Sequence, residues 1–121
     1  MTANLLLTGG PHPFVETTPL LVDLLAEEGV ATTVVTDPFE ALARLGAAEA
    51  GTGPPVDLVT VHALRWRMDQ ERYADLRSEH EVAVDDGDLA VLDRFVRAGG
   101  GLLALHTAVI CFDGASTWRA L

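Results

Sequence analysis

Residues 99–108 of this 121-residue chain read GGGLLALHTA, and this stretch decides the fold. The three glycines allow a preceding helix to stop and the chain to reverse. The apolar run that follows, residues 102–105, has no polar alternation, which is typical of a strand covered on both faces of a parallel sheet. His106 then stands at the carboxyl end of that strand, where open α/β sheets hold their chemistry. We therefore predict a buried strand that delivers a histidine to a site.

The chain before this stretch alternates between apolar runs typical of strands and segments with helical periodicity. The predicted strands cover residues 4–8, 30–36, 56–61 and 102–105, and the third of them ends at His62. Thr18 before Pro19 predicts a helix start, and Gly29 predicts its end.

Three further helical segments are predicted. Asp37, Pro38 and Glu40 indicate a helix that ends near Leu45. Acidic residues at 85–88 and arginines near 97 suit the two ends of another helix, which glycine 99 stops. A last helix begins at Ser116 or Thr117. Residues 63–84 form a long connection with one or two helical turns near 70–76.

Strands that alternate with helices predict a single α/β domain over residues 1–121, with a doubly wound parallel sheet. Right-handed crossovers favour the strand order 2-1-3-4. The topological switch point then falls between the ends of the first and third strands, and a ligand site is expected there.

Charge and cysteine content restrict the classes of partner. The chain has 18 acidic and 8 basic residues, for a formal net charge of −10. An acidic surface repels nucleic acid and anionic lipid, so we expect neither as a partner. The single cysteine, Cys111, excludes an internal disulfide, and MTANLLLTGG at the start resembles neither a signal peptide nor a spanning helix. We therefore expect a cytoplasmic protein.

Three histidines stand at or just after predicted strand ends, namely His12, His62 and His106. Because histidine titrates near neutral pH, His106 and His12 are our candidates for general acid/base catalysis. The three histidines are also possible ligands of a divalent metal, although their spacing matches no local metal motif.

Residues near these histidines are candidates for substrate binding. Gly9 and Gly10 let a ligand approach the backbone, although they form neither a dinucleotide nor a phosphate-loop motif. Glu16 and Thr17 lie at a predicted helix start, where free N–H groups hold anions or oxygen-rich ligands. The remaining candidates for substrate binding are His62 and Thr107.

The stretch Ala104-Leu105-His106-Thr107-Ala108 has the pattern small-x-His-x-small. A strand that turns sharply into a helix at a reactive residue needs small side chains two positions before and after it. We call this predicted turn the elbow. Class I glutamine amidotransferases place cysteine at that point. Histidine stands here instead, and Cys111 is interpreted as a small half-buried residue, so we do not expect a glutaminase.

The chain resembles the ThuA-like (trehalose utilisation) family of the class I glutamine amidotransferase-like superfamily. The resemblance lies in TGGPHPF (residues 8–14), TTPLLVDLLAEEG (17–29) and FVRAGGGLLALHTAV (95–109), with the following Phe112 and Trp118. It implies a flavodoxin-like three-layer fold and a role in sugar catabolism. Carried over by position, it also implies a pocket at His12 and His106, with the turn at residues 9–10.

Domains of that family are usually longer, so we expect an incomplete domain truncated at the C-terminus, with an open sheet edge that favours a homo-oligomer. Two functional hypotheses follow. The first is an enzyme that performs acid/base chemistry on a small-molecule carbohydrate, trehalose or a related keto-glycoside. The second is a sugar-binding or accessory module that performs no chemistry.

Overall fold

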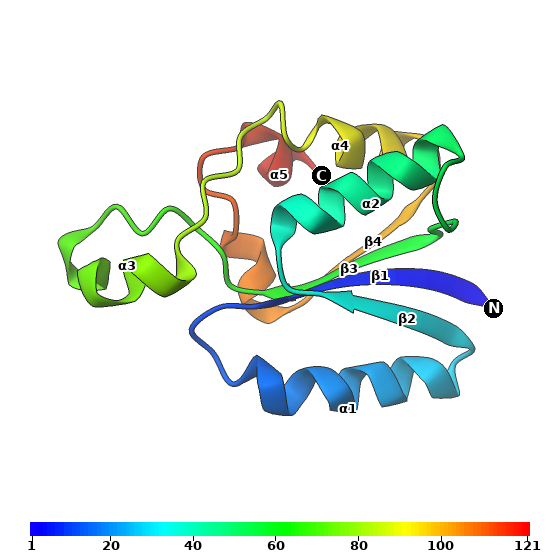
Figure 1. The fold of residues 1–121 in the computed structure, drawn as a ribbon, viewed down its shortest axis with the longest axis horizontal. Helices are drawn as coiled ribbons and strands as arrows, with labels where there is room; N and C mark the ends of the chain where they lie inside the picture. Colours follow the sequence, from blue (N-terminus) through cyan, green and yellow to red (C-terminus); the bar gives the residue numbers. More distant parts are fainter.

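The computed structural model describes residues 1–121, which form a four-stranded parallel sheet with helices on both faces (Figure 1). The strand order is β2-β1-β3-β4, as predicted, and the class is flavodoxin-like α/β. In the register, Leu6 of β1 lies between Val34 of β2 and Thr60 of β3. The strands are β1 (Thr2–Gly9), β2 (Val30–Val35), β3 (Leu58–Ala63) and β4 (Gly101–Ala104).

The helices form the two outer layers. Figure 1 shows α1 alone on one face of the sheet, with α2, α4 and α5 on the other. The helix bounds are α1 (Phe14–Glu27), α2 (Pro38–Ala50), α3 (Ala74–His80), α4 (Ala90–Arg97) and α5 (Ser116–Ala120), with short 3₁₀ helices η1 (Glu71–Tyr73) and η2 (His106–Ile110). No helix is both long enough and apolar enough to cross a membrane.

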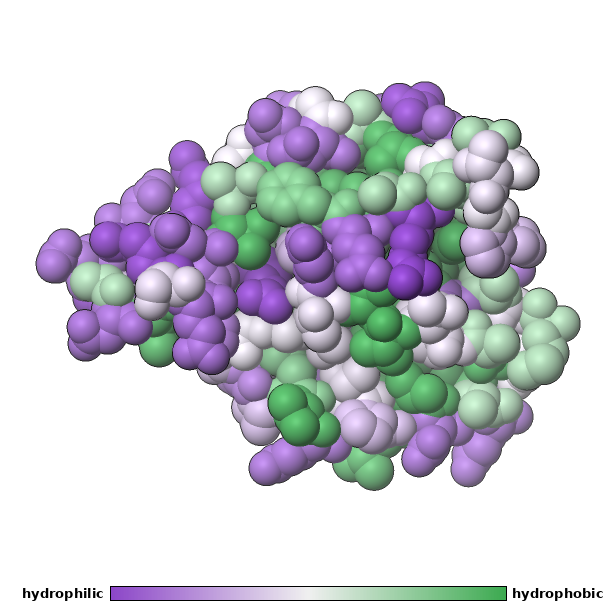
Figure 2. Space-filling model, in the orientation of Figure 1, coloured by the Kyte–Doolittle hydropathy of each residue, from purple (hydrophilic) through white to green (hydrophobic).

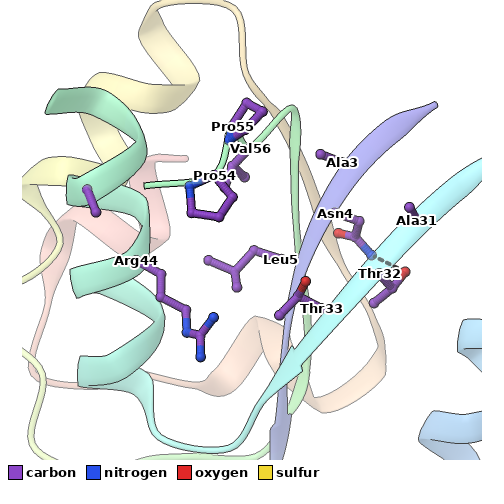
Figure 3. Close-up of a pocket in the computed structure, with 11 residues that line it drawn as sticks. Ala3, Asn4, Leu5, Ala31, Thr32, Thr33, Arg44, Pro54, Pro55 and Val56 are labelled. Carbon is purple, nitrogen blue, oxygen red and sulfur yellow. Dashed lines mark hydrogen bonds between the residues drawn. The ribbon is translucent and has the colours of Figure 1, made fainter. Parts of the chain in front are cut away.

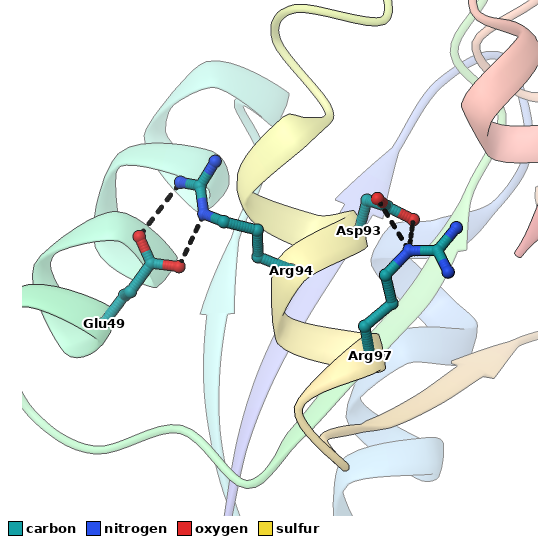
Figure 4. Close-up of polar contacts among 4 residues, drawn as sticks. All are labelled: Glu49, Asp93, Arg94 and Arg97. Carbon is teal, nitrogen blue, oxygen red and sulfur yellow. Dashed lines mark hydrogen bonds and ion pairs between the residues drawn. The ribbon is translucent and has the colours of Figure 1, made fainter.

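The main hydrophobic core lies between the sheet and the α2–α4 layer. It takes alternate residues of the central strands, such as Leu5, Leu7, Val59 and Val61, because successive side chains of a strand point to opposite faces. An ion pair joins the two helices outside this core. Arg94 of α4 donates two hydrogen bonds of 2.9 Å to Glu49 of α2 (Figure 4).

The side chains of the central strands that point to the other face of the sheet are partly polar. Asn4 of β1 donates to Thr32 Oγ1 of β2 at 3.1 Å and accepts from Thr60 Oγ1 of β3 at 2.8 Å. Asn4 and Thr60 are buried, and a buried polar group without a partner is costly. This chain of hydrogen bonds therefore joins three adjacent strands side by side.

The prediction that the first helix begins at Thr18–Pro19 is wrong, because α1 begins at Phe14 and contains Pro19. Phe14 and Thr18 are one helical turn apart, and both are buried. Their packing holds the first turn in place. Pro19 is exposed, so the Val15 carbonyl that it leaves unpaired lies on the outer side of the helix.

The second helix starts as predicted and ends later. Asp37 Oδ1 accepts from the Phe39 N–H at 2.9 Å, which caps α2. The helix passes through Gly46 and ends at Ala50, followed by Gly51 in the left-handed conformation. An alanine-rich sequence continues the helix here, so residues 46–50 are not the predicted loop.

The two later strands also differ from expectation. β3 spans 58–63, so His62 lies within the strand. β4 spans only 101–104 and is half-buried to exposed, which contradicts the prediction of a strand buried on both faces. It forms one edge of the sheet, next to β3 only.

The long connection at 63–84 contains helical turns, as predicted, and they extend to His80. It forms an arm that projects beyond the carboxyl ends of the strands and is mostly hydrophilic (Figures 1 and 2). α4 begins at Ala90, later than predicted. Before it, Asp85 and Asp88 each accept from the other's backbone N–H, which closes a turn.

Candidate active site

His12 and His106 lie together at the carboxyl edge of the sheet. His12 follows β1, and His106 follows β4. Their ring centroids are 5.6 Å apart with the rings at 74°, an edge-to-face contact. Both residues are exposed. The fold thus brings together the two predicted catalytic residues, which the sequence separates by most of its length.

The backbone at His106 has the sharp turn that the sequence indicates. His106 has φ of +54°, a left-handed conformation that is uncommon outside glycine and is enriched at functional sites. The 3₁₀ helix η2 starts there. Ala108 is fully buried, and its carbonyl accepts from Trp118 Nε1 at 2.9 Å. Ala108, two positions after His106, therefore occupies a crowded position, as predicted, whereas Ala104, two positions before it, is exposed and does not.

Phe14 connects the third histidine to this pair. Its ring centroid lies 5.1 Å from that of His62 and 5.8 Å from that of His12, in edge-to-face contacts. Phe14 is buried at 5% exposure. We call His12, Phe14, His62 and His106 the histidine cluster. The sequence reasoning missed Phe14. Its position one helical turn before Thr18 is a signal only once α1 is known to begin at Phe14.

Two threonine hydroxyls orient His62. Thr18 Oγ1 lies 3.2 Å from His62 Nδ1 and 2.7 Å from Thr8 Oγ1. Burial lowers the pKa of His62 below its ordinary value, and the nearby His106 lowers it further. Both effects favour the neutral form of the His62 imidazole.

The chain itself fills the space beside the two candidate glycines. A Cβ on Gly9 would overlap the guanidinium of Arg65, and one on Gly10 would overlap the Leu64 carbonyl. Arg65 NH2 also donates to the Thr36 carbonyl at 3.0 Å, and burial lowers the pKa of its guanidinium. Packing against the Leu64 carbonyl accounts for Gly10 without a ligand. At Gly9 the neighbour is the flexible end of the Arg65 side chain, and the positive φ of +118° is what favours glycine.

Other predicted binding groups are engaged elsewhere. The N–H groups of Glu16 and Thr17 donate to the Pro13 carbonyl at 3.1 and 3.2 Å, so they are not free to hold an anion. The Thr107 hydroxyl donates to the Ala63 carbonyl at 3.0 Å. Thr107 thus holds the elbow against β3.

Cys111 is buried and is poorly suited to nucleophilic attack. Burial raises the pKa of its thiol to about 11, although the Arg65 N–H donates to its sulfur at 3.2 Å. A thiol with this pKa is protonated at neutral pH. Cys111 is 2% exposed, so it is more deeply buried than the half-buried residue that the sequence predicts.

A groove beside α1 adjoins the histidine cluster at Phe14. This groove, of about 430 Å³, lies between α1 and β2 and is lined by Thr8, Gly9, Phe14 and Thr18, among others. Its volume falls in the range of small-molecule sites. A second cavity, of about 310 Å³, lies near the amino ends of β1 and β2 and is bordered by Arg44 and Pro54 (Figure 3). It lies far from the strand ends that carry the histidines.

The chain has no group of three or more His, Cys, Asp or Glu side chains placed to hold a metal ion. His12 and His62 pack edge to face against Phe14, and His106 packs edge to face against His12. Two adjacent imidazoles with a neutral third suit proton transfer and hydrogen bonding to oxygen.

Comparisons of the chain with protein-family models, with curated proteins and with solved structures found no match. The geometry of the histidine cluster is therefore the basis for assigning a function.

Proposed function

We propose that the chain is a ThuA-like protein that performs acid/base chemistry on a carbohydrate, trehalose or a related keto-glycoside. The family and the carbohydrate substrate come from the sequence resemblance, and one observation supports the acid/base chemistry. His12 and His106 lie in contact at the carboxyl edge of the sheet, and the His106 backbone is in a strained turn. Such an edge is where open α/β sheets bind ligands.

The proposed chemistry applies to the keto-glycoside, since trehalose has no carbonyl group, and it is enolisation next to the sugar carbonyl. One imidazole takes a proton from the carbon beside the carbonyl, and the partner, entering as imidazolium, gives a proton to the carbonyl oxygen. The carbon–hydrogen bond breaks, the electron pair forms the carbon–carbon double bond, and the enol results. Proton return restores the carbonyl with either the original or the isomeric structure. General acid/base catalysis of this kind contributes roughly 10²–10⁴-fold.

A second candidate function is a sugar-binding module without catalysis. It is favoured by the exposure of His12 and His106 and by the position of the 430 Å³ groove, which adjoins the cluster through Phe14 but is not lined by either histidine. A sugar in this groove would be bound without contact to the acid/base pair.

Exchange of the proton beside the carbonyl with solvent deuterium tests the first proposal. We expect keto-glycosides to exchange in the presence of the protein, and His106→Asn to slow this exchange by about 10²-fold or more. Asparagine suits the test because it tolerates a positive φ. His80→Asn, on the projecting arm, is the matched control and should leave exchange unchanged.

Exchange that persists at the original rate in both His106→Asn and His12→Asn would overturn the catalytic proposal. Calorimetric binding of a sugar by wild type and by His106→Asn, without exchange in either, would establish the binding module instead.

A further inference from the structure

The Thr8 and Thr18 hydroxyls form a buried pair whose protons can be assigned. Thr8 Oγ1 has one hydrogen-bond partner, Thr18 Oγ1 at 2.7 Å, and the two residues are 7% and 5% exposed. A buried hydroxyl whose proton has no acceptor is costly. Thr18 Oγ1 is the only protein acceptor within hydrogen-bond distance of Thr8 Oγ1, so we assign the Thr8 proton to this bond.

The Thr18 proton then has one destination. Thr18 Oγ1 has two neighbours, Thr8 Oγ1 and His62 Nδ1, the latter at 3.2 Å. Because Thr8 already donates to it, Thr18 donates to Nδ1. Helical threonines often donate to the carbonyl four residues back, as Thr17 does to Pro13 at 3.3 Å. Thr18 makes no such bond, so its hydroxyl serves the histidine.

This direction of donation fixes the tautomer of His62. A nitrogen that accepts a hydrogen bond carries no proton, so a neutral imidazole must carry its proton on the other nitrogen. We infer that Thr8 and Thr18 are positioning residues that hold His62 as the neutral Nε2–H tautomer, a hydrogen-bond donor to a substrate oxygen. The relay Thr8–Thr18–His62 joins β1, α1 and β3.

This inference rests on the proposed function for its substrate oxygen and gives the three histidines different tasks. His12 and His106 exchange protons, whereas His62 donates a hydrogen bond without changing charge. A neutral imidazole can polarise a carbonyl in this way.

The same tautomer disfavours metal ligation by His62. A metal-bound histidine usually donates from its second nitrogen to an acceptor. Here the second nitrogen, Nδ1, itself accepts from Thr18. Metal binding at Nε2 would require the whole relay to reverse, which would leave the Thr8 proton without an acceptor.

Nitrogen-15 NMR of the resting protein, labelled on histidine, tests the tautomer without any substrate. We expect His62 to show an unprotonated, hydrogen-bonded Nδ1 and a protonated Nε2. In Thr18→Val both shifts should move towards the averaged values of a free neutral imidazole, because the donor at Nδ1 is lost. Thr18→Ser keeps the hydroxyl and should restore the wild-type shifts.

The matched control is Thr17→Val, which removes the neighbouring exposed hydroxyl that bonds only to Pro13. It should leave the His62 shifts unchanged. If Thr18→Val does not fold, Thr8→Val/Thr18→Val removes both hydroxyls, leaves no unpaired proton and should give the same shift. A proton on Nδ1 in wild type, or unchanged shifts in both valine variants, would overturn the inference.

Exchange of the keto-glycoside proton beside the carbonyl with solvent deuterium supplies the second readout. Thr18→Val should reduce the rate and Thr18→Ser should restore it. An unchanged rate in Thr18→Val, with wild-type exchange that depends on His106, would overturn the donor role of His62. Exchange that does not depend on His106 would instead overturn the proposed function, and the NMR result for the relay would stand separately.

Discussion

Gly10 marks the closest approach between the end of β1 and the segment after β3. Its φ is +122°, and a Cβ there would overlap the Leu64 carbonyl, which is backbone and cannot move aside. Gly10→Ala should therefore cost more than about 4 kcal/mol of unfolding free energy, an exceptional value for a single substitution. Urea unfolding measures this cost.

Gly29→Ala is the matched control for Gly10→Ala. Gly29 also has a positive φ, +78°, but open space surrounds its missing Cβ. Its substitution should cost only the roughly 1–2 kcal/mol of a left-handed backbone. Equal costs at the two positions would show that the Leu64 carbonyl does not confine Gly10.

Among single residues, the sequence predicts the histidine pair but not the residues that support it. His12 and His106 are recognisable because each follows an apolar strand, and parallel strands bring their carboxyl ends together. Thr18 has the pattern of a helix cap, since it stands before Pro19. Its contacts with Thr8 and His62 depend on the three-dimensional packing of α1 against the sheet, which local spacing does not encode.

At the scale of elements, the Glu49–Arg94 pair joins α2 to α4 (Figure 4). The hydrogen bonds that Glu49 accepts from Arg94 hold the pKa of its carboxyl below the ordinary glutamate value of 4.5. A carboxyl whose folded pKa is lowered stabilises the fold fully above its unfolded pKa, and this contribution is lost as the pH falls through the folded value. Glu49→Gln should therefore lower the urea midpoint slightly at pH 7.

The difference between wild type and Glu49→Gln should shrink below pH 4.5 and in high salt, because both partners are exposed to solvent. Glu40→Gln is the control, since Glu40 pairs with Arg44 within α2 and joins no second element. A difference that persists unchanged at low pH would show that the charge of Glu49 is not its source.

Element boundaries are where the sequence predicts least well. Asp37 and Pro38 locate the start of α2 because capping is a local interaction. The start of α1 is set instead by burial of Phe14, and the end of α2 by a run of alanines that carries the helix past Gly46. Both errors come from giving one proline or glycine more weight than packing and propensity summed over a segment.

At the scale of the molecule, the alternation of strands and helices is enough to predict the parallel sheet and its strand order. Crossover handedness leaves few alternatives, so the order follows without knowledge of any side-chain contact. The exposure of β4 was not predictable in this way. Its apolar sequence is typical of a covered strand, but only β3 lies beside it and α1 lies towards β1 and β2.

The surface combines a large negative charge with apolar side chains on α1. Leu20 and Leu24 are 64% and 61% exposed and lie one helical turn apart. Hydrophobic residues interrupt the hydrophilic surface over α1 in Figure 2. The same helix carries three acidic residues, Glu16, Asp23 and Glu27, and no basic residue. Apolar attraction between molecules is therefore opposed by repulsion from a net charge of −10.

Because salt screens the repulsion and leaves the apolar attraction intact, self-association should increase with ionic strength. Leu20→Gln/Leu24→Gln should reduce this association at every salt concentration, as measured by sedimentation velocity over a range of protein concentrations. Glutamine retains helix propensity, and both positions are exposed, so the unfolding free energy should change by no more than about 0.5 kcal/mol. Val15→Gln, at an apolar position that is 91% exposed, is the control for a general loss of surface hydrophobicity. An equal reduction in Val15→Gln would show that association depends on total apolar surface and not on the pair Leu20 and Leu24.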